Sequence, residues 1–291
     1  MPLLKEIRQN IKKYTNHDSF TLIREEDAYS NTVYKVVTDD DCYIYKEYKK
    51  KSDIEAKVLH ALKRDFIVDT DTFRIEKYYE FRKPNYLKDA RSIGKSIKEF
   101  HQLRIDLPNF LEILTQMIHS FFKDEIEEQI IDKLYAKIKE RYTLFTETVT
   151  VSHNDLQPGN ILIIDDKAML IDFEYASLNN PMFDYANIFC EMSCDYSVCE
   201  LREELMPSEE EKRRMLEGYV NENIDNMLFV ANKLMCCSHF LWYLWARKYV
   251  KNTNDNSFNY LKYGISRLFF LKKENLIDQK EYEILKEKML K

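Results

Sequence analysis

Strong positive charge and long apolar runs are both missing from this sequence. The 291 residues carry a formal net charge of -6, and no basic stripe indicates a nucleic-acid or anionic-membrane partner. The first thirty residues contain no continuous apolar segment, so no secretory signal is expected. The most apolar stretch, Leu234 to Ala246, is too short to span a membrane. These absences predict a globular cytoplasmic protein without a nucleic-acid partner or a membrane span.

Cysteine is present, but its spacing indicates neither disulfides nor a zinc site. None of the six cysteines forms a CxxC pair, and no histidine completes a ligand set beside Cys190, Cys194 and Cys199. Because cytoplasmic thiols are normally reduced, we expect buried free cysteines. With 45% hydrophobic residues, the chain can bury a large core, in one domain or in two lobes.

The periodicity of apolar residues divides the chain at about residue 80. Before it, helical spacing predicts helices over 3–14 and 52–62, and strand-like patterns occur in four runs, 20–23, 32–37, 43–48 and 74–79. After it the pattern is mainly helical, with amphipathic stripes over 90–103, 110–122 and 126–138. His101 ends one stripe, and we interpret it as a packed core residue. An α+β fold with lobes 1–80 and 81–291 is predicted.

The most informative stretch runs from Val151 to Glu191. It contains His153-Asn154-Asp155, an asparagine five residues after the aspartate at Asn160, and a second aspartate, Asp172, behind an apolar run. Residues 161–171 predict a β-hairpin that brings Asp172 beside Asn160. A buried carboxylate and amide at adjacent strand ends are costly without a cation. The alternative is an ordinary hairpin with polar ends.

Metal-assisted phosphoryl transfer requires this combination of residues. We assign Asp155 as the catalytic base that accepts the proton of a substrate hydroxyl. Asn160 and Asp172 are the predicted Mg²⁺ ligands. Glu174 is a candidate for binding a second ion or for ordering the ligands of the first.

Nucleotide-binding residues are expected mainly in the first lobe. The linker from Arg24 to Asn31 lies where a phosphate-covering loop is expected, but it holds none of the four glycines, so its backbone cannot approach phosphates as closely. Lys46, within a predicted strand, is the candidate phosphate ligand, paired with Glu55; the alternative is an exposed charge in a lysine cluster. The predicted nucleotide contacts are Ser30, Asn31, Thr32, Lys46, Glu76, Lys77, Tyr78 and Gln157.

Three blocks of sequence resemble the signatures of the choline/ethanolamine kinase family, a branch of the kinase-like fold shared with aminoglycoside phosphotransferases. They are HNDLQPGN from 153, LIDFEYASLNNPMFDYANIFCEM from 170 and SHFLWYLW from 238. The resemblance implies a bilobal protein-kinase-like fold with a small β-rich and a larger helical lobe. It also implies ATP-dependent phosphorylation of an amino alcohol, two Mg²⁺ ions and frequently a homodimer. With choline as acceptor, the phosphocholine product begins phosphatidylcholine synthesis by the CDP-choline route.

Aromatic residues supply the parts of a quaternary-ammonium site. Such a cation has no hydrogen-bond donor, so proteins hold it with aromatic faces and a nearby carboxylate. Trp242 and Trp245, the only tryptophans, share one face of a predicted helix; the alternative is ordinary core packing. By resemblance, Glu191 is the counter-charge, and the substrate-binding set is Tyr175, Glu191, Tyr196, Trp242, Trp245, Phe258, Tyr260 and Tyr263. The residues assigned to structural support are His153, Glu55, Asp184, Asn187 and Arg267.

Choline is the preferred acceptor, because the stretches 155–157 and 189–191 resemble choline-preferring members. Ethanolamine stays open, since the two pockets share most aromatic residues. Another small-alcohol phosphotransferase, such as one for an antibiotic, is less favoured because a polycationic substrate calls for a more acidic lining. A choline-binding pseudo-enzyme is suggested by the glycine-free loop and opposed by the intact Asp155, Asn160 and Asp172.

Overall fold

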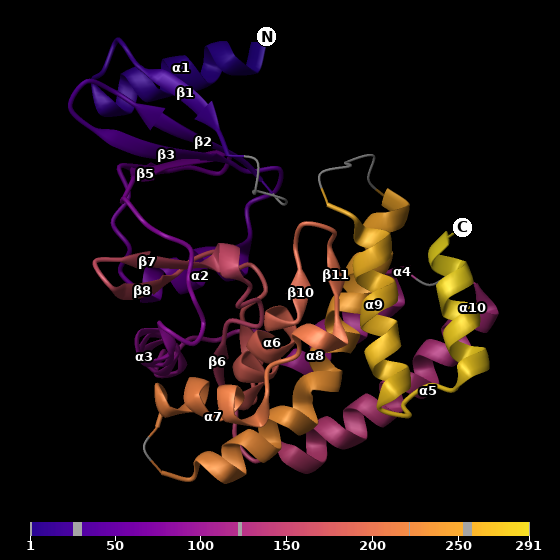
Figure 1. The fold of residues 1–291 in the computed structure, drawn as a ribbon. Helices are drawn as coiled ribbons and strands as arrows, with labels where there is room; N and C mark the ends of the chain where they lie inside the picture. Colours follow the sequence, from indigo (N-terminus) through magenta and orange to yellow (C-terminus); the bar gives the residue numbers. More distant parts are fainter. Residues whose placement is uncertain (1, 26–30, 122–123, 221, 253–257, 291) are drawn as a thin grey trace. The chain divides into compact units, whose positions relative to one another are not determined.

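The computed structural model describes residues 2–25, 31–121, 124–220, 222–252 and 258–290. The chain divides into two compact units, Met1–Arg82 and Lys83–Lys291 (Figure 1). The first unit is β-rich and the second mainly helical, as the sequence predicts. The assignment of nucleotide binding to the first and of catalysis to the second stays a prediction.

The first unit is built on an antiparallel sheet with the order β1-β2-β3-β5-β4. Its strands are β1 (Thr21–Arg24), β2 (Thr32–Val37), β3 (Cys42–Glu47), β4 (Val68–Asp69) and β5 (Phe73–Lys77). Helix α1 (Pro2–Thr15) buries Ile7 and Ile11 against Tyr45 and the other apolar side chains of one face. Because side chains alternate along a strand, Lys46 points to the opposite face, toward α2 (Asp53–Ala61). Strand β4 was not predicted, because it is too short to show a period.

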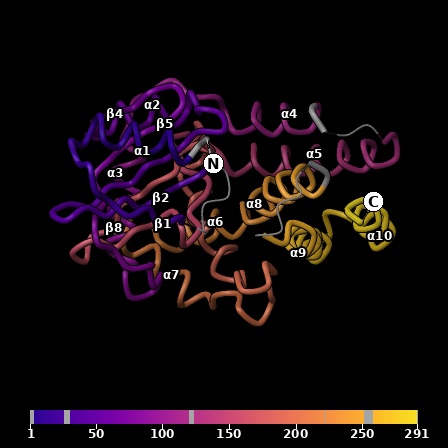
Figure 2. The backbone as a smooth tube through the Cα atoms, turned by 90° about the horizontal axis from the view of Figure 1, so that it is seen from above, coloured from indigo at the N-terminus to yellow at the C-terminus, as the bar shows by residue number. Residues whose placement is uncertain are grey.

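The second unit packs its helices around the long helix α8. The helices are α3 (Ala90–His101), α4 (Phe110–Phe121), α5 (Glu125–Phe145), α6 (Met182–Met192), α7 (Glu209–Glu217), α8 (Ile224–Asn252), α9 (Tyr260–Lys273) and α10 (Gln279–Leu290), with 3-10 turns at Pro158–Asn160 and Glu203–Leu205. Helix α8 contacts α4, α5, α6, α7 and α9, and Figure 2 shows it between α5 and α9.

Three short antiparallel ladders complete the second unit. They pair β6 (Thr150–Ser152) with β9 (Ser177–Asn179), β7 (Ile161–Ile164) with β8 (Lys167–Leu170), and β10 (Cys194–Asp195) with β11 (Glu200–Leu201). The β7–β8 hairpin was predicted from the sequence. The other two ladders were not, because β9, β10 and β11 are only two or three residues long.

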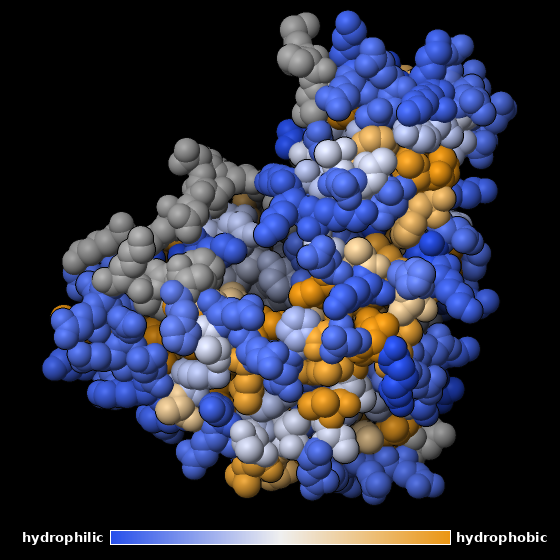
Figure 3. Space-filling model, turned by 180° about the vertical axis from the view of Figure 1, so that it is seen from behind, coloured by the Kyte–Doolittle hydropathy of each residue, from blue (hydrophilic) through white to orange (hydrophobic). Residues whose placement is uncertain are grey.

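Helix α8 is longer than the apolar stretch Leu234 to Ala246 that it contains. By length and composition its residues Ile224–Val250 could cross a membrane, which corrects the expectation that the segment is too short. However, 72% of its most apolar window is buried inside the structure, as in the core helix of a folded domain. On the face shown in Figure 3, hydrophobic residues are interspersed among hydrophilic ones.

Two of the four glycines lie at one contact between α3 and the end of α7. A Cβ atom on Gly94 would lie 2.3 Å from the carbonyl carbon of Gly218, and one on Gly218 would lie 2.2 Å from the carbonyl oxygen of Ala90. Neither glycine has a positive φ. Glycine is therefore needed here for close approach of two backbones and not for an unusual turn.

A buried polar group joins α6, α8 and α9. The Nδ1 atom of His239 lies 3.4 Å from the guanidinium of Arg267, and its Nε2 lies 3.5 Å from the thiol of Cys190. Because a guanidinium only donates hydrogen bonds, Nδ1 is the acceptor. Burial and the charge of Arg267 lower the pKa of His239 well below its ordinary value of 6.5. This imidazole is therefore neutral in the folded protein.

Replacing Gly218 by alanine should destabilise the second unit. The new methyl group meets the backbone of α3, so the helices must separate, at a cost of about 1–3 kcal/mol. Denaturant unfolding measures this change. Gly159→Ala is the matched control, because the nearest atoms to its Cβ would be those of the Gln157 side chain, at 3.4 Å or more. Equal stabilities of the two variants would contradict the close-packing role.

Acidification should weaken the fold through His239. In the unfolded chain this histidine binds a proton below about pH 6.5, whereas the buried ring does not, so stability falls as the pH falls. Between pH 7 and pH 5 the wild type should lose about 2 kcal/mol more than His239→Asn, which keeps an acceptor for Arg267. Urea unfolding at each pH measures the difference. His119→Asn, at an exposed position, is the control; parallel profiles for wild type and His239→Asn would refute the assignment.

Candidate active site

Asp184 holds the loop that carries Asp155. Its carboxylate accepts hydrogen bonds from the backbone N–H groups of His153, at 3.0 Å, and Asn154, at 2.7 Å. It also contacts the His101 ring at 2.9 Å. Burial raises the pKa of Asp184, but the hydrogen bond and charge of His101, together with the charge and backbone N–H of His153, leave that pKa below its ordinary value. The carboxylate therefore stays ionised and binds two successive backbone amides.

His101 is packed in the core, as expected, but it also has a polar role. Its other ring nitrogen lies 3.0 Å from the hydroxyl of Tyr219, and the residue is 4% exposed. The sequence offered no sign of the Asp184 contact, because the two residues are 83 positions apart. Tertiary packing alone brings them together.

Both backbone polar groups of Leu156, the residue after Asp155, form hydrogen bonds with side chains. The N–H group of Leu156 donates to Asn187 Oδ1 at 2.6 Å, and its carbonyl accepts from the hydroxyl of Tyr86 at 2.8 Å. Asn187 thus binds the backbone of this loop, and its assignment to structural support stays a prediction. Tyr86 was missed, since it lies in a segment without periodicity or motif.

The predicted hairpin brings Asn160 and Asp172 to adjacent strand ends. Ile161 pairs with Leu170, and the N–H group of Ile171 donates to the carbonyl of Asn160 at 3.0 Å. Asp172 follows directly, with φ of 63°. The ring of His153 contacts the Ile171 carbonyl at 2.9 Å, so this histidine ties the loop to the hairpin.

Asp155 lies in a cluster of acidic groups. The Asn160 amide donates to its carboxylate at 2.7 Å. Burial raises the pKa of Asp155 well above its ordinary value, and the charges of Glu191, Asp172 and Glu174 raise it further, against the effect of the Asn160 bond. Carboxylates and a side-chain amide supply hard oxygen donors of the kind that Mg²⁺ prefers.

This donor set fits a magnesium ion that is bound partly by the protein and partly by the phosphates of a nucleotide. Among the residues that the structure describes, no three His, Cys, Asp or Glu side chains group into a complete protein metal centre. Mg²⁺ commonly binds one or two carboxylates and completes its shell with phosphate oxygens and water. Gln157 lies half-buried in the same loop, with its side chain beside Gly159.

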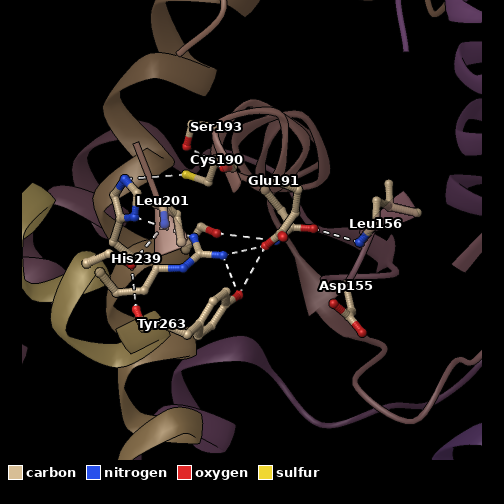
Figure 4. Close-up of polar contacts among 12 residues, drawn as sticks. Asp155, Leu156, Cys190, Glu191, Ser193, Leu201, His239 and Tyr263 are labelled. Atoms are coloured by element: carbon tan, nitrogen blue, oxygen red, sulfur yellow. Dashed lines mark hydrogen bonds and ion pairs between the residues drawn. The ribbon is translucent and has the colours of Figure 1, made fainter. Parts of the chain in front are cut away.

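Glu191 is buried in a polar network and already has a cationic partner. Its carboxylate accepts from the guanidinium of the fully buried Arg267 and from the hydroxyls of Tyr196 and Tyr263, the latter at 3.3 Å. Asn187 lies 3.4 Å from the same carboxylate. Figure 4 shows Glu191 between Leu156 on one side and Tyr263 on the other. Its assignment as the counter-charge of a cationic substrate stays a prediction, because Arg267 already balances its charge.

The predicted aromatic residues other than Tyr196 gather around Trp245 and form an aromatic cluster. Its ring centroid lies 5.0–6.0 Å from the centroids of five other rings: Trp242, Tyr249, Phe258, Tyr260 and Tyr263. Its indole N–H donates to the hydroxyl of Tyr175 at 2.7 Å. Tyr249 was not predicted, although it lies one helical turn after Trp245 and the spacing of α8 could have indicated it.

In the first unit, Lys46 forms the predicted pair with Glu55. Its ammonium lies 3.0 and 3.3 Å from the two carboxylate oxygens. Lys46 is 8% exposed, so the alternative of an exposed surface charge is wrong. Arg74 also approaches Glu55, at 3.5 Å. A buried lysine oriented by a helix glutamate is the arrangement that kinases use to bind nucleotide phosphates.

The other predicted nucleotide contacts are distributed over the same sheet. Asn31 is buried, and its Oδ1 accepts from the Lys49 backbone at 3.3 Å. Thr32 begins β2 opposite Glu47. Glu76 pairs with Arg74 at 3.3 Å, Lys77 is exposed, and the Tyr78 ring lies 3.7 Å below the Lys35 ammonium. Ser30 lies outside the described residues.

Comparison with known proteins agrees with this geometry. A family model described as choline/ethanolamine kinase matches residues 74–272. The chain is 30% identical over 230 residues to a probable choline kinase 3 of Arabidopsis thaliana, an alignment that covers 68% of this chain and 63% of that protein. The chain thus spans less than two thirds of the length of its first curated relatives.

Solved structures share the fold over almost the whole chain. A choline kinase from Cryptosporidium parvum superposes with a TM-score of 0.72 at 19% identity, covering 96% of this chain and 97% of that one. An ADP-bound aminoglycoside phosphotransferase gives 0.62 at 17% identity, with 97% of both chains covered. The family match extends over more than half of the sequence, and the chain belongs to the choline/ethanolamine kinase family, with its bilobal protein-kinase-like fold.

Proposed function

We propose that this protein transfers the γ-phosphoryl group of ATP to the hydroxyl of choline. One observation carries the proposal: the indole N–H of Trp245 donates to the hydroxyl of Tyr175 at 2.7 Å. Tyr175 directly follows Glu174 and lies three residues after Asp172. The hydrogen bond therefore joins the aromatic cluster to the acidic groups that surround Asp155.

The proposed reaction uses Asp155 as the base. The choline O–H bond breaks as its proton passes to the Asp155 carboxylate, an O–P bond forms, and the bond between the γ-phosphorus and ADP breaks. Burial and neighbouring negative charges raise the pKa of Asp155, which strengthens it as a proton acceptor. Asn160 orients the carboxylate through its 2.7 Å hydrogen bond.

The charged groups around the phosphates have separate proposed roles. Asn160, Asp172 and Glu174 would hold Mg²⁺, which when bound neutralises charge on the transferring phosphates. Lys46 binds the nucleotide phosphates, and Glu55 orients its ammonium at 3.0 Å. The predicted contacts from Asn31 to Tyr78 then bind the rest of the nucleotide.

Choline is proposed over ethanolamine because of the lining of the aromatic cluster. Seven rings, including Tyr175, pack together, while Glu191, which accepts from the Tyr263 hydroxyl, is already paired with Arg267. A trimethylammonium group needs aromatic faces and no hydrogen-bond acceptor, whereas a primary ammonium needs three acceptors. The product would be phosphocholine, formed in the cytoplasm for phospholipid synthesis, and the family resemblance favours a homodimer.

The direct test is ADP release with ATP and Mg²⁺, measured in parallel with choline, ethanolamine and an aminoglycoside. We expect kcat/KM to be highest with choline. A higher value with ethanolamine would reassign the acceptor, and one with the aminoglycoside would place the activity in another class. Binding of choline without any turnover would show a pseudo-enzyme and refute the proposal.

Asp155→Asn should lower kcat by about 10²- to 10⁴-fold, because the amide cannot accept the proton. The KM for choline should change little, and circular dichroism should stay that of the wild type. Asp165→Asn is the matched control, since this aspartate lies exposed in the turn of the neighbouring hairpin. Wild-type turnover by Asp155→Asn would eliminate the assignment of the base.

A further inference from the structure

The aromatic cluster has a buried side and an accessible side. Four of its rings are 6% exposed or less, namely Trp242, Phe258, Tyr260 and Tyr263. Three rings are half-buried, namely Tyr175, Trp245 and Tyr249. A ligand can reach the half-buried rings without displacing core side chains, so these three form the accessible face.

Tyr249 is held rigidly at this face. Its ring stacks on Tyr260, with centroids 5.3 Å apart and an interplanar angle of 15°. It also lies 5.0 Å from Trp245 at 49°. Because the buried Tyr260 supports it from behind and Trp245 from the side, little side-chain entropy remains for a ligand to remove.

Tyr249 also lies close to the acidic side of the site. Burial raises the pKa of its hydroxyl, the charge of Glu174 raises it further, and a hydrogen bond with Tyr175 opposes the shift. Glu174 is one of the residues proposed to hold the metal ion. Tyr249 thus lies where the aromatic face meets the groups proposed to transfer the phosphate. The ammonium group of an amino alcohol is two carbons from its hydroxyl. When that hydroxyl is at the phosphate-transferring groups, the ammonium group would therefore lie at this place.

Building on the proposed function, we propose that Tyr249 contacts the cationic head group of the acceptor and sets the preference for a methylated over a primary ammonium. The rings of Tyr249 and Trp245 meet at 49° with centroids 5.0 Å apart, so a trimethylammonium group bound at the accessible face would contact both rings. A primary ammonium is more strongly hydrated and gains less from an aromatic face. The specificity of the site then depends on a residue outside the motif blocks.

The test compares Tyr249→Ala, Tyr249→Leu and Tyr249→Phe. Loss of the ring in the first two should raise the KM for choline about three- to tenfold with kcat within about twofold, whereas the KM for ethanolamine should change less than twofold. Tyr249→Phe keeps the ring and should keep the choline KM. Phe229→Ala is the matched control, because it removes a half-exposed ring from the same helix, where Phe229 packs against Phe145.

A binding measurement separates this proposal from the proposed function. Both tryptophans of the chain belong to the cluster, so tryptophan fluorescence reports on this site alone. Titration with tetramethylammonium should give a Kd that rises in Tyr249→Ala and Tyr249→Leu by the same factor as the choline KM. If the wild-type enzyme phosphorylates no acceptor, the proposed function fails, and this titration still decides the role of Tyr249.

Three results would overturn the proposal. The first is an unchanged choline KM and tetramethylammonium Kd in Tyr249→Leu, which retains the bulk of the side chain. The second is an equal rise of the choline and ethanolamine KM values, which would show a general packing role. The third is a loss of choline affinity in Tyr249→Phe as large as in Tyr249→Ala, which would assign the effect to the hydroxyl.

Discussion

The loop that carries the proposed base depends on one buried carboxylate. Asp184 accepts two successive backbone N–H groups, those of His153 and Asn154, and is itself held by His101. A buried backbone N–H without a partner costs as much as a lost hydrogen bond or more. The loop before Asp155 therefore has one low-energy position, and this position determines where the side chains that follow it lie.

The same principle of paired buried charges extends through the second unit. Glu191 and Arg267 balance each other, and the neutral His239 accepts from the same guanidinium. Removing one partner of a buried ion pair of this kind is costly, because the remaining charge stays buried without a counter-charge. The network connects α6 to α9 and, through Asn187, reaches the peptide after Asp155. Hydrogen bonds through Asn187 therefore link the Glu191–Arg267 pair to the loop that carries Asp155.

Short-range features of the site followed from the sequence. The hairpin that brings Asp172 beside Asn160 needs only two apolar strands and a polar turn, and it forms as predicted. The pairing of Lys46 with Glu55 was predicted because a strand lysine and the next helix are close along the chain. Contacts over longer separations were not predicted: Tyr86 with Leu156, His101 with Asp184, and the β6–β9 ladder.

By itself, the sequence determined the family, the two-part α+β composition and the identity of the residues around Asp155, because these depend on local periodicity and on motif spacing. Only the tertiary structure decided which charges are balanced and which rings a ligand can reach. Glu191 looks like a free counter-charge until Arg267 packs against it from 76 positions away. Tyr249 looks like one more helical tyrosine until Tyr260 of the next helix stacks on it. Burial and charge pairing result from the packing of distant segments, and no local pattern encodes them.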